Sequence, residues 1–313
     1  MSYVDFFGME REPFSNAPDA RFFFNSDQHS QALTRLMYAV DSNKGLAVLV
    51  GGVGAGKTTL ARRMLDRLSE DRYQSSLLVM VHSGVTPEWI LTRIALQLGV
   101  EAPKEDRLEL LRQLYDRLLQ IHESGKTAVV LIDEAQMLQS RALMEEFRGL
   151  LNLEIPGKKL LNIVFFGLVE MEDCLRLDEP LAQRVALKYH LKSLTATLTE
   201  SYVRYRLHIA GSRRMIFQPE SILAIHSCTG GVPRLINTVC DNALLEAFLR
   251  KLNHVDLRIV QSVAGDLGLL RPNLQQAVPR AVAEENFAVT PAPAAATDLD
   301  DIESMLDRLE FKG

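Results

Sequence analysis

The chain has 313 residues, of which 47% are hydrophobic and 24% are charged, and its formal net charge is -5. This length is enough for two domains with a substantial core. The near-neutral charge excludes a strongly basic protein that binds nucleic acid through its overall charge. The three cysteines are far apart and include no CxxC pair, which favours buried thiols in a reducing compartment over disulfides or a zinc site.

The N-terminal sequence MSYVDFFGMERE carries acidic residues where a secretory signal needs a basic segment followed by an apolar run. No window of the sequence approaches the roughly 20 apolar residues that cross a bilayer. We therefore expect a cytoplasmic protein, which reaches the inner membrane only indirectly, through a partner.

Short apolar segments alternate with amphipathic ones over the first two thirds of the chain. The segment 45–50, GLAVLV, is typical of a buried strand in a parallel sheet. The same reasoning predicts strands at 77–81, 128–132, 160–166 and 185–191, and helices at 59–69, 87–98, 107–122 and 140–151. Strands alternating with helices predict an α/β domain with a doubly wound parallel sheet, here over residues 1–194.

The remainder of the chain shows helical patterns alone, at 199–210, 219–226, 233–250 and 256–267. They predict a smaller all-α domain over residues 195–270. Residues 271–297 are rich in Pro and Ala and predict a flexible linker. Residues 298–313 are acidic and predict an amphipathic helix. Either residues 298–311 dock into an unknown protein partner, or this end of the chain is frayed and solvated.

The stretch GGVGAGKTT lies between the first predicted strand and the first predicted helix. It fits the pattern GxxxxGK[ST], in which backbone N–H groups converge on phosphate oxygens, the lysine reaches the outer phosphates and the hydroxyl holds Mg²⁺. An accidental glycine-rich turn is disfavoured, because a strand ends here and a helix begins. We expect ATP or ADP to be bound by Gly51, Gly52, Val53, Gly54, Ala55, Gly56, Lys57, Thr58 and Thr59.

A second apolar strand ends in paired carboxylates, in VVLIDEAQ at 129–136. Asp133 is expected to hold Mg²⁺ together with Thr58, and Glu134 to orient and polarise the water that attacks the γ-phosphate. The letters DEAQ also suggest a DEAD-box helicase, but the chain lacks the second alternating domain that such an enzyme closes over nucleic acid.

Two arginines are candidates for the same catalytic site. Arg184 directly precedes the strand predicted at 185–191, where an AAA+ ATPase places a finger toward the nucleotide of a neighbouring subunit. Arg234 begins the helix predicted at 233–250, from which it is expected to contact the γ-phosphate. For each of them, a solvated or ion-paired surface role is the alternative.

Five segments together resemble the ExeA/GspA group of AAA+ ATPases, the general secretion pathway protein A family. They are YVDFFGMEREPFSNAPDARFFFNSDQHSQAL, VGGVGAGKTT, LIDEAQ, LAQRVALKYHL and TGGVPRLIN, and the resemblance covers about residues 3–268. Relatives occur at exopolysaccharide and exosortase loci, and TniB transposition ATPases are more distant kin. The resemblance implies an AAA+ P-loop NTPase with a helical lid that self-associates as a ring or another homo-oligomer and uses ATP with Mg²⁺.

Two departures from the family pattern bear on function. Leu168 stands where the family commonly has Gln, which leaves open whether hydrolysis is fast. Secretion members continue into a transmembrane helix and a peptidoglycan-binding domain, neither of which is expected here, so cell-wall remodelling is not inferred. The aromatics Phe6, Phe7, Phe14 and Phe22 to Phe24 are expected to attach the N-terminal segment to the core, with an adenine contact as the alternative.

Three functions follow from these observations. The leading hypothesis is an ATP-driven regulator or assembly motor of an envelope secretion or exopolysaccharide system. The second is a DNA-dependent ATPase of the TniB type, which is not favoured because close basic pairs outside the helix after the phosphate loop are few, among them Arg213–Arg214 and Lys158–Lys159. The third, motivated by Leu168, is a nucleotide-bound scaffold with little hydrolysis.

Overall fold

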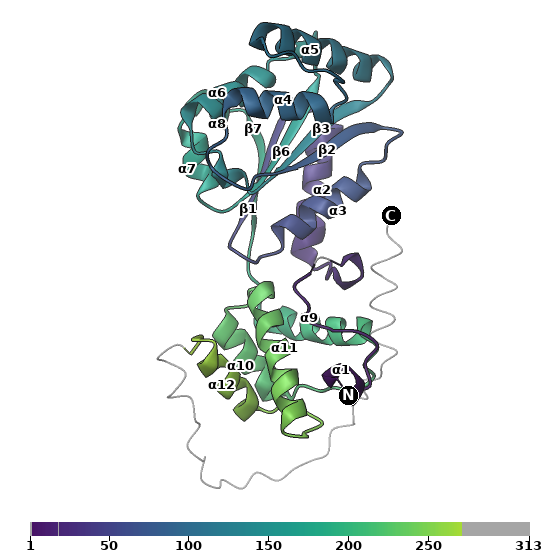
Figure 1. Ribbon diagram of the computed structural model, residues 1–313, viewed down its shortest axis with the longest axis vertical. Helices are drawn as coiled ribbons and strands as arrows, with labels where there is room; N and C mark the ends of the chain where they lie inside the picture. The colour runs from purple at the N-terminus through teal and green to yellow at the C-terminus, as the bar shows by residue number, and fades with distance from the viewer. Residues whose placement is uncertain (1, 18, 271–313) are drawn as a thin grey trace, which may run out of the picture. The chain divides into compact units, whose positions relative to one another are not determined.

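The computed structural model describes residues 2–17 and 19–270. The predicted linker at 271–297 and the terminal segment 298–313 lie outside the described residues. Within the described part, a parallel five-stranded sheet has the order β2-β3-β6-β1-β7, and β4 and β5 form a small antiparallel pair (Figure 1). The strands are β1 (Leu46–Gly51), β2 (Tyr73–Val79), β3 (Thr127–Asp133), β4 (Glu154–Ile155), β5 (Lys158–Lys159), β6 (Leu161–Gly167) and β7 (Val185–Leu191).

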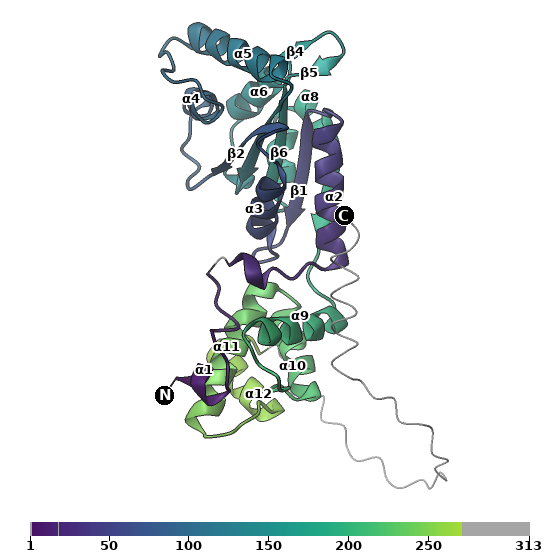
Figure 2. The ribbon, with the colours of Figure 1, turned by 90° about the vertical axis from the view of Figure 1, so that its right-hand side faces the viewer.

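Helices cover both faces of the sheet, which confirms the doubly wound α/β fold. The described residues form twelve α-helices and two short 3-10 helices, only some of which cover the sheet. They are α1 (Tyr3–Phe6), η1 (Ala20–Phe22), α2 (Asp27–Asp41), α3 (Lys57–Arg67), α4 (Pro87–Gln97), α5 (Arg107–Glu123), η2 (Ala135–Met137), α6 (Arg141–Leu150), α7 (Met171–Arg176), α8 (Glu179–Ala182), α9 (Ala196–Ile209), α10 (Pro219–Thr229), α11 (Pro233–Leu249) and α12 (Leu257–Asp266). In Figure 2, α2 lies on one side of the sheet and α4, α5 and α6 on the other.

The alternation of side chains along the central strands explains the two layers of helices. In β1, Val48 and Val50 pack with α4, α5 and α6, whereas Ala47 and Leu49 pack with α2 and α3. Strand β1 is buried on both faces and apolar throughout, as is typical of a central strand in a parallel sheet. The central strands therefore hold their carboxyl ends, and the loops that follow them, on a rigid core.

The all-α region has a hydrophobic core of its own. Helices α9 to α12 pack around Val203, Ile225 and Ala243, which are fully or almost fully buried. The chain enters this region through Leu194, whose N–H donates to Gly231 O at 2.8 Å. A Cβ on Gly231 would lie 1.9 Å from Leu194 O, and the φ of Gly231 is +71°, so this turn requires glycine.

Most of the N-terminal segment packs with the helical region, although Phe23 packs against the cluster of α2 and α3. Phe14 and Phe22 are buried in the same cluster as α9 to α12, and Phe6 contacts Phe248 edge to face at 5.4 Å. This differs from our assignment of the whole of 1–194 to the α/β domain. The physical reason is that the aromatic side chains of this segment bury apolar surface in the core of the helical region.

Most predicted elements appear with ends shifted by one to four residues. The strand expected at 77–81 differs most from its prediction. Strand β2 begins at Tyr73, and its first half includes three polar residues that an apolar pattern does not predict. It lies at the edge of the sheet, where burial does not demand an apolar sequence. Helix α2 was not predicted.

Within the described residues, no helix is both long and apolar enough to cross a membrane.

Candidate nucleotide-binding site

The glycine-rich loop follows β1 and ends where α3 begins. Gly54 and Gly56 have φ values of +74° and +98°, a region that glycine enters without strain. Gly56 is the N-cap of α3 and provides no side-chain cap, so the first N–H groups of the helix are available to a ligand. The turn and the helix dipole together form a site suited to phosphate.

Lys57 is the first residue of α3 and only 6% exposed. Its Nζ donates to Gly51 O at 3.0 Å and to Gly52 O at 2.9 Å, so the side chain runs back along the loop. Burial lowers the pKa of Lys57, and the carboxylates of Glu134 and Asp133 oppose this shift. A buried ammonium beside backbone N–H groups favours an anionic ligand.

Asp133 is the last residue of β3 and is fully buried. Its Oδ1 accepts from Glu134 N–H at 3.0 Å, while its Oδ2 has no hydrogen-bond partner among the described residues. Burial raises the pKa of Asp133, and the neighbouring Thr58 hydroxyl and Glu134 N–H oppose this shift. An orphaned carboxylate oxygen near a threonine hydroxyl and a phosphate loop fits the oxygen ligands of Mg²⁺.

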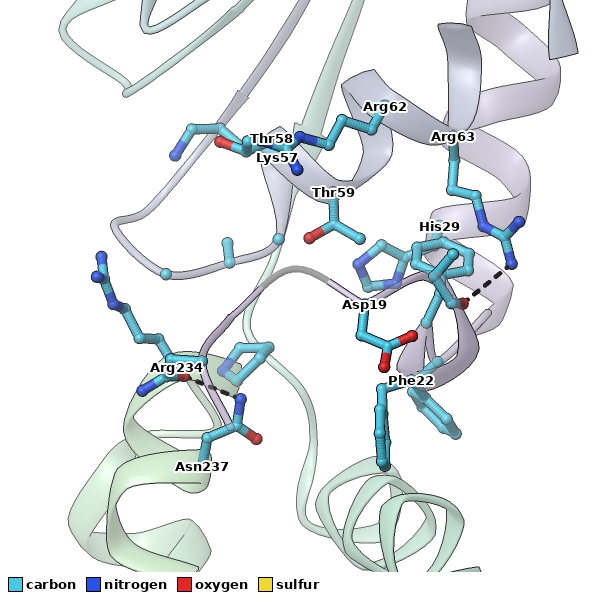
Figure 3. Close-up of a pocket in the computed structure, with 18 of the residues that line it drawn as sticks. Asp19, Phe22, His29, Lys57, Thr58, Thr59, Arg62, Arg63, Arg234 and Asn237 are labelled. Atoms are coloured by element: carbon cyan, nitrogen blue, oxygen red, sulfur yellow. Dashed lines mark hydrogen bonds between the residues drawn. The ribbon is translucent and has the colours of Figure 1, made fainter. Parts of the chain in front are cut away.

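The helical region contributes Arg234 from the first turn of α11. The Arg234 N–H donates to Gly54 O at 3.3 Å, which joins this helix to the phosphate loop. Figure 3 shows Lys57, Thr58 and Thr59 of α3 lying across the pocket from Arg234 and Asn237 of α11. Arg234 is therefore placed to reach a ligand held by the loop.

Replacing Gly54 by Ala should weaken ATP binding. A Cβ there would lie 2.7 Å from Arg234 Cβ and 3.1 Å from Val232 Cγ1, on a residue with a φ of +74°. The loop and α11 must separate, and we expect the ATP dissociation constant to rise on the order of 10-fold, which corresponds to about 1.4 kcal/mol. Titration calorimetry measures this constant. The matched change Gly149→Ala meets no atom within 4 Å on the exposed side of α6 and should leave ATP affinity unchanged.

A cavity of about 560 Å³ connects the phosphate loop with the N-terminal segment and the helical region. A volume of this size suits a small-molecule ligand. Its lining includes Glu134, Leu168 and Arg234, together with residues 15–17, 19–20 and 22–24 of the N-terminal segment. The aromatic side chains of that segment thus attach it to the helices, and three of them, Phe22 to Phe24, also border the cavity.

Arg206 fixes the N-terminal segment along this cavity. Its Nη2 donates to Ser15 O at 2.9 Å and its Nε to Pro13 O at 2.5 Å, while the guanidinium lies over the Phe22 ring at 4.7 Å. Asn237 Nδ2 donates to Asn16 Oδ1 at 3.0 Å. Sequence reasoning did not single out Arg206 or Asn237, because the residues that they contact lie some 200 positions away in the sequence.

His29, on α2, is a third lining residue that sequence reasoning missed. Its Nδ1 lies 2.7 Å from Ser26 Oγ, and a Cβ on Gly56 would lie 3.3 Å from its Nε2. Burial lowers the pKa of His29, and the Ala55 backbone opposes this shift. The helical spacing of Ala32, Leu33 and Leu36 could have revealed α2, but nothing in the sequence places His29 on the loop.

Arg184 does not lie in this cavity. Strand β7 runs parallel to β1 with Val185 opposite Leu46 and Leu191 opposite Gly51, so Arg184 is at the end of the sheet away from the phosphate loop. Its Nη1 donates to Arg148 O at 3.2 Å and to Asn152 Oδ1 at 2.6 Å. Any contact of Arg184 with a nucleotide must therefore involve the site of a second copy.

Most of the chain resembles a known protein in sequence. Residues 40–175 match the family model described as AAA domain. Over 263 residues, the chain is 38% identical to general secretion pathway protein A of Aeromonas hydrophila. The chain carries an AAA domain and is related to general secretion pathway protein A. The match covers 82% of this chain but only 47% of that relative, so the chain spans about half the length of the protein that it matches.

Solved structures confirm the fold around the AAA domain. Cdc6p from Pyrobaculum aerophilum has a TM-score of 0.62 and 17% identity, covering 81% of this chain and 70% of that one. The ORC2 protein of Aeropyrum pernix has a TM-score of 0.60 and 18% identity, covering 82% of this chain and 72% of that one. At these identities the likeness establishes the AAA+ P-loop NTPase fold alone.

Proposed function

We propose that this protein is a Mg²⁺-dependent ATPase that binds and hydrolyses ATP. The observation that supports it most is the convergence of three features on one cavity: the phosphate loop, Glu134 at the end of β3, and Arg234 from the helical region. Each comes from a different part of the fold, and a phosphoryl-transfer site needs all three kinds of group. A glycine-rich turn that formed by chance would not be expected to share a cavity with a carboxylate and an arginine from distant parts of the chain.

The chemistry follows from the positions of these side chains. The loop N–H groups and Lys57 bind the β- and γ-phosphates, and Thr58 and Asp133 would hold a magnesium ion, which offsets phosphate charge when bound. Glu134 accepts a hydrogen bond from the water that attacks the γ-phosphorus, so that ADP and inorganic phosphate form. Arg234 stabilises the charge that develops on the γ-phosphoryl oxygens.

For the biological role, we propose an oligomeric regulator or assembly motor of an envelope secretion or exopolysaccharide system. Relatedness to general secretion pathway protein A supports the secretion setting. Arg184 lies away from the cavity of its own chain, and this position supports a contact between Arg184 and the nucleotide of a neighbouring copy. We propose that it works in the cytoplasm and contacts the membrane only through a protein partner.

A phosphate-release assay on the full chain with ATP and Mg²⁺ tests this proposal. We expect steady turnover that stops when Mg²⁺ is chelated. Replacing Lys57 by Ala removes a buried charge that faces the phosphates and should raise the ATP dissociation constant about 100-fold, equivalent to about 3 kcal/mol. A protein that binds ATP but shows turnover at background when fully assembled would instead be a nucleotide-bound scaffold, as Leu168 suggests.

A further inference from the structure

A buried amide side chain connects the proposed catalytic carboxylate to the neighbouring strand. Gln136, in η2, is only 5% exposed. Its Nε2 donates to Glu134 Oε2 at 2.6 Å, and its Oε1 accepts from the Leu168 N–H at 3.0 Å. Both ends of the amide are thus engaged, and the group cannot rotate without losing one of the two bonds.

The backbone around Gln136 is shaped to allow these contacts. Glu134 has φ 56° and ψ 36°, a left-handed conformation that non-glycine residues rarely adopt and that often marks functional sites. It turns the chain directly after β3, so that residue 136 comes back beside residue 134. The Cys174 thiol also donates to Gln136 O at 3.6 Å, which attaches the turn to α7.

The strand on the other side leaves room for the amide. A Cβ on Gly167 would lie 3.3 Å from Gln136 Oε1 and 3.1 Å from Met171 Cβ, so a larger residue would press on the amide. Strand β6 is paired with β3 as far as Phe165 opposite Ile132, which fixes the Leu168 N–H relative to Asp133 and Glu134. The anchor for Gln136 is therefore rigid.

A glutamate carboxylate reaches a productive position only if its side-chain torsions are held. The side chain of Leu168 cannot hydrogen bond, although it borders the cavity beside Glu134. Its backbone N–H can, and Gln136 carries that contact across to Glu134.

We propose that Gln136 is a positioning residue, which holds the Glu134 carboxylate in orientation for attack of water by anchoring it to the Leu168 backbone. This inference rests on the proposed function, because it concerns the same hydrolysis. In this role a buried amide links the carboxyl ends of β3 and β6, where Glu134 and Leu168 border the cavity.

Two variants of Gln136 separate positioning from packing. Gln136→Met keeps the length and apolar volume but loses both hydrogen bonds, and kcat for ATP should fall about 100-fold. Gln136→Glu keeps an acceptor for the Leu168 N–H but places a carboxylate against Glu134, so kcat should fall at least as far. In both, KM for MgATP should stay close to that of the unaltered protein, since neither change touches the phosphate loop.

The control is Gln139→Met, the same chemical change three residues later on an exposed position, which should leave kcat unchanged. A kcat of Gln136→Met within about twofold of the unaltered protein overturns the inference, because a positioning role requires a much larger loss. So does a Gln136→Glu variant with normal turnover, which would mean that only packing matters. If Gln136→Met does not fold, as judged by circular dichroism, Gln136→Glu decides alone. Absence of turnover in the unaltered chain is a different result, since it defeats the proposed function and this inference with it.

Discussion

An ATPase assay of the Glu134→Gln variant is expected to show kcat reduced by about 10²–10⁴-fold, the range lost when a positioned general base is removed. Glutamine keeps the size of the side chain and can still accept a hydrogen bond from Gln136 through its amide oxygen. It cannot take a proton from water. The turn after β3 should therefore survive, and the loss should appear in the chemical step.

Binding of ATP separates this effect from damage to the site. The phosphate loop, Lys57 and Arg234 are unchanged in Glu134→Gln, so the ATP dissociation constant should match that of the unaltered protein. Calorimetry and single-turnover assays on the same preparation report binding and chemistry separately. Turnover of the variant close to that of the unaltered protein would show that Glu134 does not activate the attacking water.

Arg184→Ala should show the second large effect, a fall in kcat of about 10³-fold, the lower range for an arginine that stabilises transferred phosphoryl charge. Arg184 lies at the end of β7 away from the cavity of its own chain, so this loss is expected only if copies associate. Its present contacts, Arg148 O and Asn152 Oδ1, hold the side chain in place without neutralising its charge.

Mixing experiments show in which copy Arg184 acts. Lys57→Ala subunits bind ATP only weakly but retain Arg184, whereas Arg184→Ala subunits bind ATP but lack the arginine finger. If Arg184 serves a neighbouring site, mixing the two inactive variants should restore a substantial part of the activity. Unaltered activity of Arg184→Ala, measured alone under assembling conditions, would assign this side chain to surface packing only.

The central strands and the phosphate loop could be predicted from sequence because their signals are local. A short, wholly apolar segment such as GLAVLV between turn residues favours a strand buried on both faces, and the glycine and lysine positions of the loop are constrained by the backbone. The alternation of strands and helices predicted a parallel sheet with helices on both faces. It predicted neither the order of the strands in the sheet nor which helices cover each face, because both depend on the crossover connections.

The rest of the candidate site depends on contacts between distant segments. Arg206 meets Ser15 and Pro13, and Asn237 meets Asn16, through a packing of the N-terminal segment on α9 and α11 that no sequence period reports. The role inferred for Gln136 likewise depends on the Leu168 N–H, a backbone group that any residue type provides. The Leu168 side chain cannot make the polar contact that a glutamine would make at this position. In the structure, the Leu168 N–H makes a polar contact instead, with Gln136 Oε1.

Titration calorimetry of the full chain with ATP and Mg²⁺ tests the central claim most directly, namely that the loop at 51–59 binds a nucleoside triphosphate. We expect saturable binding of both ATP and ADP at one site per chain, and Lys57→Ala should lose most of the affinity. Absence of any binding by the intact, folded protein, or equal binding by Lys57→Ala, would contradict it.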